Sequence, residues 1–375
     1  MRLAVTLMVR DEADVIGPVI DNFIRQGADT LIVTDNGSVD GTVEILESYG
    51  DRIDLRHDPI QRKQQFSVVT GMARDAATIH GADWVVNADA DEFWFPRAEG
   101  VTLHDVFAEL PRALVSFHVP VIDMIGDPAA RGSGLQRLTL QDRRPVERMN
   151  ALGIHAHATP DAVHVGSAEV EVAQGNHFVN LHGEGEVPEG LELEVLHLPW
   201  RSWAQFEAKV EKSGRAYESN PELLPSPNHH GMREYKRFAA GALFAYYVIR
   251  HPGEEERAEG LRSGDFVTDL RVADAFPSPV ADVPLDPVEL AGARRWGEVI
   301  AAQERDGLLA RAAADAREAE LLGYIDEAKD RIDGLLEDVR AVEAREARLH
   351  DELSAMQARK IVRLSDAVSR RLPGH

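Results

Sequence analysis

Three acidic side chains fall within four positions at the end of an apolar run, in the stretch WVVNADADEFWFP from residue 84 to residue 96. They are Asp89, Asp91 and Glu92, and aromatic residues follow them. Unpaired carboxylates in one place repel each other, so their grouping predicts a cation or a set of sugar hydroxyls as partner. The Asp-X-Asp spacing suits Mg²⁺ or Mn²⁺, which takes one or two carboxylates and completes its shell with water and substrate phosphate.

The same spacing also begins a calcium-binding EF-hand loop. Counted from Asp89, the sixth position is Trp94 where that loop requires Gly, and the twelfth is Gly100 where it requires Glu. The sequence therefore excludes the EF-hand and leaves the hard divalent ion.

Two further acidic positions follow apolar runs. Asp11 and Glu12 come after RLAVTLMV, and Asp35 comes after TLIV in the turn-like segment TDNGSVDGT. Any one of them could be an ordinary solvated turn. Ligands of a doubly wound sheet bind beyond the carboxyl ends of its strands, so three acidic strand ends favour one shared ligand site. The segment is neither GxGxxG nor a Lys-bearing phosphate loop, which excludes those nucleotide motifs.

Strands must alternate with helices to bring these ends to one edge, and the first hundred residues have that pattern. Apolar positions recur at helical spacing from Val15 to Ile24, and further helices are expected at 43–49 and 64–80. Strands are expected at RLAVTLMV, TLIVTD, IDLRHD and WVVNAD. This α/β pattern predicts a doubly wound, mostly parallel sheet. Short extended runs in 113–200 predict a mixed section, and SWAQFEAKVEKSG predicts a helix.

The composition limits the class of protein. The 375 residues carry 41 Lys and Arg against 64 Asp and Glu, a formal charge of -23, which argues against a nucleic-acid partner. There is no cysteine, so disulfides and thiolate metal sites are excluded.

The longest apolar stretch, Phe238 to Ile249, is too short for a membrane span of about 20 residues and is expected to form a buried helix. A cytoplasmic protein is expected.

Beyond a Pro-rich linker at 277–287, residues 303–372 contain almost no helix breaker. Spacings of three and four favour a coiled coil, and hence a homo-oligomer, over a solvated helix; the seam is Ile325, Ala328, Ile332, Leu335, Val339, Val342, Leu349, Leu353 and Met356. The basic end ARKIVRLSDAVSRRL could touch anionic lipid at the inner membrane face, although a solvated helix end explains it as well. The expected organisation is a domain at 1–215, a helical extension at 216–275, a linker and helix start at 276–302, and a coiled coil at 303–375.

Several of these segments together resemble the nucleotide-sugar glycosyltransferases of family 2, which have the GT-A fold. The resemblance rests on VRDEADVIGPVIDNFIRQGAD, VTDNGSVDGT and NADADEF, and it extends to HLPWRSWAQFEAKVEKSG, which is similar to the His-X-Pro-X-Arg-Ser segment of one bacterial branch. It covers residues 1 to about 215. Arg10-Asp11-Glu12 stands where many relatives have Asn-Glu, and the family's Glu-Asp base motif is missing from the acceptor half.

The resemblance implies roles for individual residues. Asp35 would bind the donor's nucleoside, with Asp11 or Glu12 nearby, and Asp89 would lie near the ribose and the metal. Asp91 would ligate a divalent Mn²⁺ or Mg²⁺ on the diphosphate. The resemblance further implies His197 as a metal or diphosphate ligand and Arg201 as a phosphate clamp. Arg74 could face the diphosphate, although a solvated helix face is an equal alternative.

A carboxylate beside the acceptor hydroxyl is needed if transfer is a direct displacement. Asp123, in PVIDMIGDP, is the first candidate for this catalytic base, and Asp127 and Asp142 remain open. For each of them alone, a turn carboxylate is the simpler explanation.

His155 and His157 would share one face of a strand as a metal pair, although a pair at an open surface is the simpler explanation. His177, in GNHFV, could line the acceptor site, although an ordinary hydrogen-bonded histidine explains it as well. The pair His229-His230 lies in a Pro-rich loop and carries no decisive signal.

The expected function is metal-dependent transfer of a sugar from a nucleotide-diphosphate donor, with a UDP-sugar as first choice, to the hydroxyl of a glycan or lipid-linked acceptor. By analogy with the family, the transfer would invert the anomeric centre and serve surface-polysaccharide or glycolipid synthesis. One alternative is a nucleotidyltransferase, which would carry a Gly-rich basic loop where VRDEADVI stands. The other is a non-catalytic scaffold that displays the coiled coil.

Overall fold

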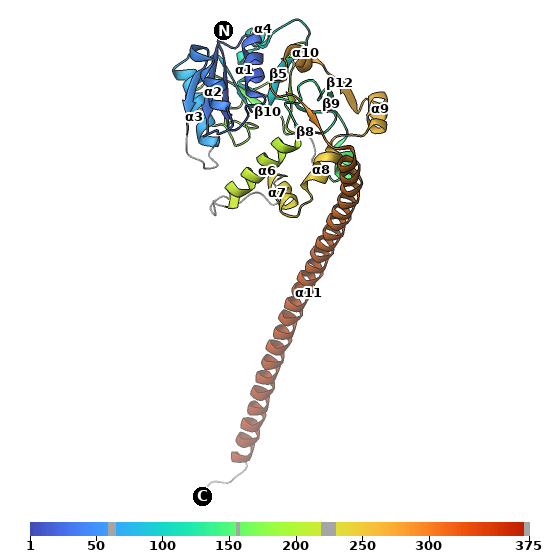
Figure 1. Ribbon diagram of the computed structural model, residues 1–375. Coiled ribbons are helices and arrows are strands. Elements are labelled where there is room, and N and C mark those ends of the chain that lie inside the picture. Colours follow the sequence, from blue (N-terminus) through green and yellow to red (C-terminus); the bar gives the residue numbers. More distant parts are fainter. Residues whose placement is uncertain (59–64, 155–157, 219–229, 371–375) are drawn as a thin grey trace. The chain divides into compact units, whose positions relative to one another are not determined.

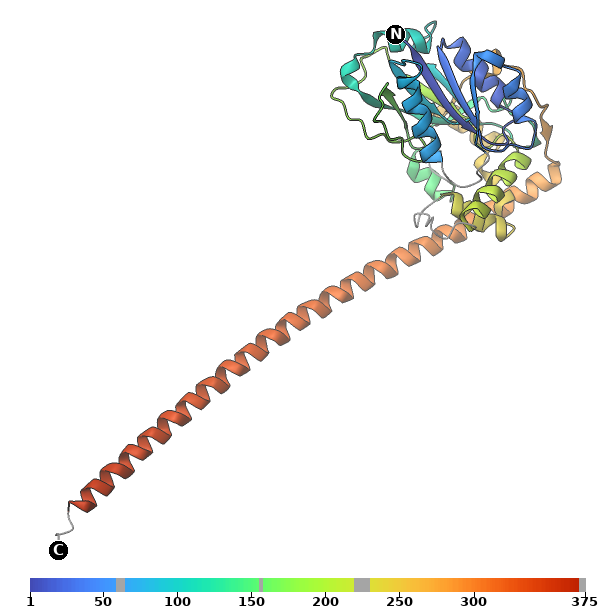
Figure 2. The same cartoon turned by 90° about the vertical axis from the view of Figure 1, so that its left-hand side faces the viewer.

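The computed structural model describes residues 1–58, 65–154, 158–218 and 230–370. It divides into two compact units, Met1–Arg305 and Asp306–His375, and each is described by itself. Figure 1 and Figure 2 show the sheets and helices of the first unit.

The first unit is built on a six-stranded sheet with the order β3-β2-β1-β4-β10-β6. β1, β2, β3 and β4 are parallel, whereas β10 is antiparallel to both of its neighbours, β4 and β6. The expected parallel, doubly wound arrangement of the amino-terminal half is confirmed. The strands are β1 (Leu3–Val9), β2 (Thr30–Asp35), β3 (Asp54–His57), β4 (Trp84–Ala88), β6 (Ser116–Val119) and β10 (Asp161–Val165).

Helices cover both faces of this sheet because its strands are apolar on both sides. Ala4, Ile32 and Val85 pack with α3 (Gln65–Thr78) on one face. The alternate residues Val5 and Val33 belong to the cluster on the other face, which includes α1 (Ile16–Arg25), α2 (Thr42–Glu47) and α4 (Leu103–Glu109). Alternating side chains from one strand thus supply two cores.

A five-stranded mixed sheet of order β12-β9-β7-β11-β5 completes the core and confirms the expected mixed section. Its strands are β5 (Glu92–Pro96), β7 (Val121–Ile125), β9 (Leu140–Asp142), β11 (Leu193–His197) and β12 (Phe266–Thr268). The aromatic run after the acidic motif is β5, and all five of its residues are buried. The chain therefore passes from the first sheet to the second through Asp89, Ala90 and Asp91.

The remaining elements of the first unit are mostly helical. They are α5 (Val146–Ala151), α6 (Trp203–Glu218), α7 (His230–Ala239), α8 (Leu243–Arg250), α9 (Glu254–Ser263), α10 (Arg271–Ala275), the strands β8 (Ala129–Arg131) and β13 (Val283–Pro284), and the 3₁₀ turns η1 (Gly50–Arg52) and η2 (Arg112–Leu114).

The apolar run from Phe238 to Ile249 is not one helix, contrary to expectation. Gly241 has a φ of 68°, which an α-helix cannot accommodate, so α7 ends before it and α8 begins after it. The Pro-rich segment includes β13, which pairs with β8. The next element, α11 (Pro287–Ser369), begins with a proline. Proline lacks the backbone N–H, but the first N–H groups of a helix have no partner within the helix, so no hydrogen bond is lost.

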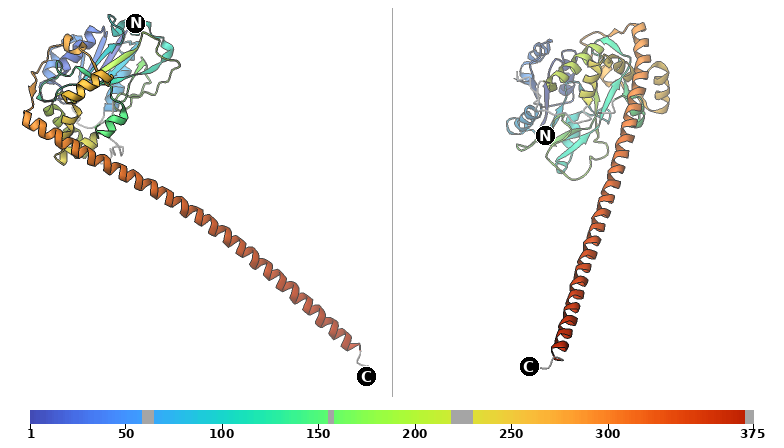
Figure 3. Two further views of the ribbon diagram at one scale, coloured as in Figure 1. Left: turned by 90° about the vertical axis from the view of Figure 1, so that its right-hand side faces the viewer. Right: turned by 90° about the horizontal axis from the view of Figure 1, so that it is seen from below.

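The second unit consists of the later part of α11, an uninterrupted helix (Figure 3). The large apolar side chains of the predicted seam are exposed, for example Ile325 at 49% and Ile332 at 56%. Among the described residues, no helix has the length and apolar character to cross a bilayer.

Candidate active site

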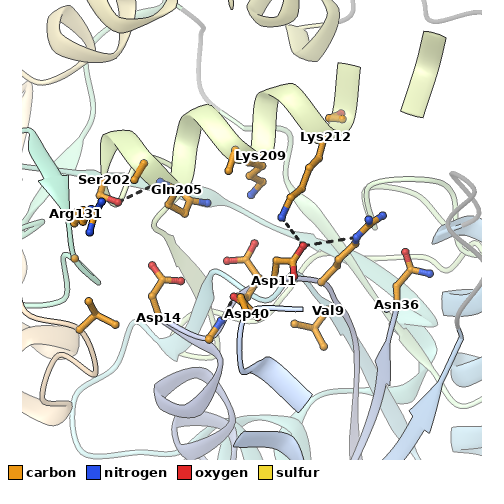
Figure 4. Close-up of a pocket in the computed structure, with 18 of the residues that line it drawn as sticks. Val9, Asp11, Asp14, Asn36, Asp40, Arg131, Ser202, Gln205, Lys209 and Lys212 are labelled. Carbon is orange, nitrogen blue, oxygen red and sulfur yellow. Dashed lines mark hydrogen bonds and ion pairs between the residues drawn. The ribbon is translucent and has the colours of Figure 1, made fainter. Parts of the chain in front are cut away.

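A cavity of about 620 Å³ opens where the carboxyl ends of β1 and β2 face helix α6 (Figure 4). Its lining combines both signs of charge with two neutral amides. Arg10, Asp11, Glu12, Asp14, Asn36 and Asp40 follow the strand ends, Arg131 comes from β8, and Gln205, Lys209 and Lys212 come from α6. This is the edge at which a doubly wound sheet binds ligands.

Asp11 is held at this rim by an unusual backbone conformation and by three contacts. Its φ is 56°, a region that non-glycine residues seldom occupy and that concentrates at functional sites. Its carboxylate accepts the Val39 N–H at 2.8 Å and meets Lys212 Nζ at 2.5 Å, while its own N–H donates to Ser38 Oγ. Burial would raise the pKa of Asp11, but Lys212 and the Val39 N–H outweigh it and lower that pKa.

Asp91 is buried and surrounded by cations. Its Oδ2 lies 2.7 Å from Lys209 Nζ and 3.5 Å from Arg201 Nη1, and its Oδ1 lies 3.7 Å from His197 Nε2. Although burial acts in the opposite direction, Lys209 and His197 lower the pKa of Asp91 well below its ordinary value. Asp91 is therefore ionised and joins β4 to both α6 and β11.

The register of the second sheet brings His197 to this point. In the β11–β5 pair His197 stands opposite Glu92, and in the β11–β7 pair it stands opposite Asp123. His197 Nδ1 lies 2.9 Å from Asp123 Oδ1. Burial would lower the pKa of His197, but Asp91 and Asp123 raise it well above 6.5, so the ring carries a proton at neutral pH.

Arg201 is fully buried and ties three acidic groups together. It bonds to Glu12, to both oxygens of Asp14 at 2.9 and 3.0 Å, and more weakly to Asp91. Its side chain is 0% exposed. The expected phosphate clamp is thus, in this conformation, a clamp on the protein's own carboxylates, and it sets the position of the β1 end.

Asp123 does not stand open to an acceptor. It is 1% exposed, Oδ1 contacts His197, and Oδ2 accepts from Arg250 Nη2 at 2.8 Å. The Arg250 guanidinium in turn lies 3.7 Å from the ring centroid of Trp200. In this structure the predicted base is thus enclosed, and its carboxylate contacts His197 on one side and Arg250 on the other.

A second buried group surrounds the first acid of the motif. Asp89 Oδ1 accepts from Asn176 Nδ2 at 2.9 Å, and the Asp89 N–H donates to Glu92 Oε2 at 3.0 Å. Burial and Asp91 raise the pKa of Asp89. Burial, Asp161 and Asp89 raise the pKa of Glu92 well above its ordinary value, and burial with Asp89 raises the pKa of Asp161 to about 7. His177 Nδ1 lies 2.9 Å from Asp161 Oδ1.

The residues fit a divalent ion with two protein ligands. The described part of the chain holds no group of three or more His, Asp or Glu arranged around a metal position. Asp91 Oδ1 and His197 Nε2 can supply two ligands, and Mg²⁺ or Mn²⁺ ordinarily takes the rest from water and phosphate. His197 also has the usual outer partner of a metal-binding histidine, because the Asp123 carboxylate fixes its second ring nitrogen.

Other predicted site residues lie elsewhere or serve the local backbone. Asp35 accepts from the N–H groups of Gly37 and Ser38 at 3.0 and 3.2 Å, so it caps its own turn beside the cavity. Arg74 donates to the Val170 carbonyl oxygen on the far side of α3 and is not in this group.

The two open alternatives for the base are also paired. Asp127 forms an ion pair with Arg257 at 2.8 Å, and Asp142 forms one with Arg144 at 2.7 Å. His155, His157 and His229 lie outside the described residues, as does the side chain of His230.

Lys209 and Lys212 were not predicted as site residues, although their spacing in the sequence is informative. They are three residues apart, so they share one face of α6, and this face adjoins the buried side chains of Phe206 and Val210. No local sequence pattern pointed to Asp14 or Arg250, because the contact that each makes in the site joins segments more than a hundred residues apart.

Comparisons with known proteins give one family match and several structural neighbours. The family model described as Glycosyl transferase family 2 matches residues 5–161. Among solved structures, S. aureus TarS (residues 1–349) overlaps with a TM-score of 0.32 and 11% identity, over 83% of this chain and 92% of that one. Glucosyl-3-phosphoglycerate synthase from Mycobacterium tuberculosis, in complex with Mn²⁺, UDP and glucosyl-3-phosphoglycerate, gives 0.27 and 16%, over 68% and 81%.

At these TM-scores no residue role is transferred to this chain. No curated protein sequence matches it. The family match spans β1 to the start of β10 and includes the acidic motif, so this part of the chain is similar to glycosyl transferase family 2.

Proposed function

We propose that this protein transfers a sugar from a nucleotide-diphosphate donor to an acceptor hydroxyl, with a divalent metal held at Asp91 and His197. The observation that carries the proposal is the position of Asp91, which lies between Lys209, Arg201 and His197 beside a cavity of donor size. A site that gathers cations and oxyanions at a strand edge is suited to a pyrophosphate.

The cavity is large enough for most of a nucleotide sugar. At about 620 Å³ it lies within the 300–1,000 Å³ range of small-molecule sites. In this proposal Asp11, Asn36 and the Asp35 turn contact the nucleoside, and Lys209 and Lys212 face the diphosphate. Both lysines now pair with carboxylates, and each can exchange that partner for a phosphate oxygen within its side-chain reach.

The metal would neutralise the charge that develops on the leaving diphosphate. The protein's own part is to hold the ligands. Asp123 keeps the ring of His197 aligned, Arg250 keeps Asp123 in place, and Arg201 fixes the β1 end against Asp91. The proton on His197 Nε2 leaves when a metal binds there, so metal affinity should fall as the pH is lowered.

We also propose that the second unit joins two or more copies of the chain. Along α11 the seam side chains from Ile325 to Met356 recur at the spacing of a coiled coil, and those of Val339 and Leu349 are 53% and 57% exposed. A second copy would bury them. The acceptor in this proposal is a glycan or lipid-linked sugar, and the basic end of α11 would let a cytoplasmic enzyme touch an anionic membrane surface.

The proposal is tested by a thermal-shift panel of UDP-, GDP- and dTDP-sugars, each with and without Mn²⁺, followed by assays of nucleotide release. A ligand that binds only the folded state raises its stability by about 2.7 kcal/mol at a hundred times its Kd. We expect one class of donor to give a shift that Mn²⁺ increases. No shift and no nucleotide release with any donor would leave a scaffold as the better account.

A further inference from the structure

We propose that His177 is the catalytic base that accepts the proton of the acceptor hydroxyl, with Asp161 as its positioning partner. The inference rests on the proposed function and names a residue of the same site. It concerns the segment from Gly175 to Phe178, which does not line the donor cavity.

The segment is tied directly to the donor edge. Asn176, the residue before His177, is 2% exposed and donates to Asp89 Oδ1 at 2.9 Å. Asn176 also has a φ of 63°, in the left-handed region that Asn tolerates better than most residues. Both features fix the start of the His177 side chain relative to the acidic motif.

The ring of His177 has the arrangement of a general base. Its Nδ1 lies 2.9 Å from Asp161 Oδ1, and Asp161 is 1% exposed, so the carboxylate cannot turn to solvent. In the tautomer that carries its proton on Nδ1, the ring donates to Asp161 Oδ1 and Nε2 is the basic nitrogen. The side chain of His177 is 31% exposed, so a substrate can reach it.

The neighbouring residues leave room for the ring. A Cβ on Gly175 would lie 3.0 Å from Nε2 and from Cδ2 of His177, and Gly175 has a φ of 81°, so any other residue there would crowd the ring. On the other side Phe178 is 58% exposed, and its ring packs edge-on against His118 at 5.8 Å. An exposed aromatic face beside a hydrogen-bonding group is a suitable surface for a sugar acceptor.

The chemical step balances without another reagent. The acceptor O–H gives its proton to His177 Nε2, and its oxygen forms a bond to the anomeric carbon of the donor. The bond from that carbon to the diphosphate oxygen breaks, and the electron pair leaves with the nucleotide. When no acceptor is present, a water molecule can take its place, which gives slow donor hydrolysis.

Other histidines in the chain provide a control. His80 Nε2 lies 3.2 Å from Asp54 Oδ2 at the edge strand β3, and its side chain is 26% exposed against 31% for His177. His80→Ala removes a His–carboxylate contact away from the donor edge and should leave hydrolysis unchanged.

The test uses the full chain with Mn²⁺ and with UDP-glucose, UDP-galactose, UDP-N-acetylglucosamine and GDP-mannose as probes. For the donor that the wild type hydrolyses, His177→Ala and Asp161→Asn should lower kcat by 100-fold or more, in keeping with the loss of a general base (about 10²–10⁴). Donor affinity, measured by calorimetry, should change by less than about threefold, because neither residue lines the donor cavity. Added imidazole should restore part of the activity of His177→Ala and none of that of Asp161→Asn.

Unchanged hydrolysis in His177→Ala would overturn the inference, and so would a loss that imidazole does not relieve while donor affinity is kept. If the wild type binds and hydrolyses none of the probes, the proposed function itself fails, and that outcome is seen before any variant is compared.

Discussion

The ammonium group of Lys209 lies 2.7 Å from Oδ2 of Asp91, the second acid of the Asp-Ala-Asp motif. This contact joins helix α6 to the carboxyl end of β4 across 118 residues of sequence. It places a cation beside the acidic motif, where the proposed diphosphate would lie.

Lys209→Met should weaken nucleotide-sugar binding about tenfold, because it removes one cation from the diphosphate side of the cavity. Calorimetry with the best donor of the panel measures the change, which corresponds to about 1.4 kcal/mol. Lys236→Met, an exposed lysine on α7, is the matched control and should leave the affinity as it is. Equal affinities for the two variants would remove Lys209 from the site.

Arg250→Met should destabilise the fold, since it leaves buried carboxylates at Asp123 and Asp142 without their shared cation. Arg250 is 3% exposed and lies 2.8 Å and 3.7 Å from these two groups. Loss of one partner from such a buried pair costs about 3–5 kcal/mol, which urea unfolding can measure. Arg262→Met removes a pair that is 75% exposed on the arginine side and should cost under about 0.5 kcal/mol. A loss below 1 kcal/mol in Arg250→Met would show that the cation does not hold Asp123.

The buried side chain of His164 should make the free energy of unfolding depend on pH. Burial lowers its pKa to about 4, whereas the unfolded side chain titrates near 6.5. Between pH 6.5 and pH 4 the unfolded chain binds the extra proton, so the free energy of unfolding contributed by His164 falls as the pH is lowered. Across the window the loss approaches about 3 kcal/mol. Urea unfolding of the wild type and of His164→Leu at pH 7.5 and pH 4.5 checks this, since the difference between the two proteins should shrink or reverse at the lower pH. A difference independent of pH would rule out a neutral buried ring.

Removal of residues 306–375 should separate assembly from donor binding. Their exposed apolar side chains are the proposed contact between copies, and none of the residues that line the cavity belongs to them. Light scattering should report a smaller assembly for the shortened chain, with its donor-induced thermal shift retained. An unchanged mass would dispose of the coiled coil.

The sequence predicted the amino-terminal part of the fold because the signals there are local. β1, β2 and β4 are continuous apolar runs, α1 has a regular 3.6-residue spacing, and each strand end is marked by an acid. The placement of β5 was not predicted, although its five buried residues follow the acidic motif directly. An apolar run gives no sign of which sheet it enters, because that depends on pairing with β11, a hundred residues away.

The sequence predicted the acidic residues of the site better than its basic residues. The structure brings together four predicted residues, Asp91, His197, Glu12 and Arg201. The sequence favoured this grouping because the two acids follow predicted strands and the other two residues belong to the HLPWRS segment. Asp123 was singled out for a different role, because the sequence could not reveal that Arg250 and His197 take both of its oxygens. Lys209 was missed for a related reason, since its target depends on how α6 crosses the sheet.

The metal assignment at Asp91 is tested most directly by the thermal shift that Mn²⁺ adds to that of the best nucleotide sugar. Asp91→Asn keeps the shape of the side chain but removes the charge that binds the ion, and Asp127→Asn changes an exposed carboxylate paired with Arg257 and serves as control. We expect the Mn²⁺-dependent part of the shift, a few degrees in the wild type, to vanish in Asp91→Asn and to persist in Asp127→Asn. A full Mn²⁺-dependent shift in a folded Asp91→Asn protein would contradict the account.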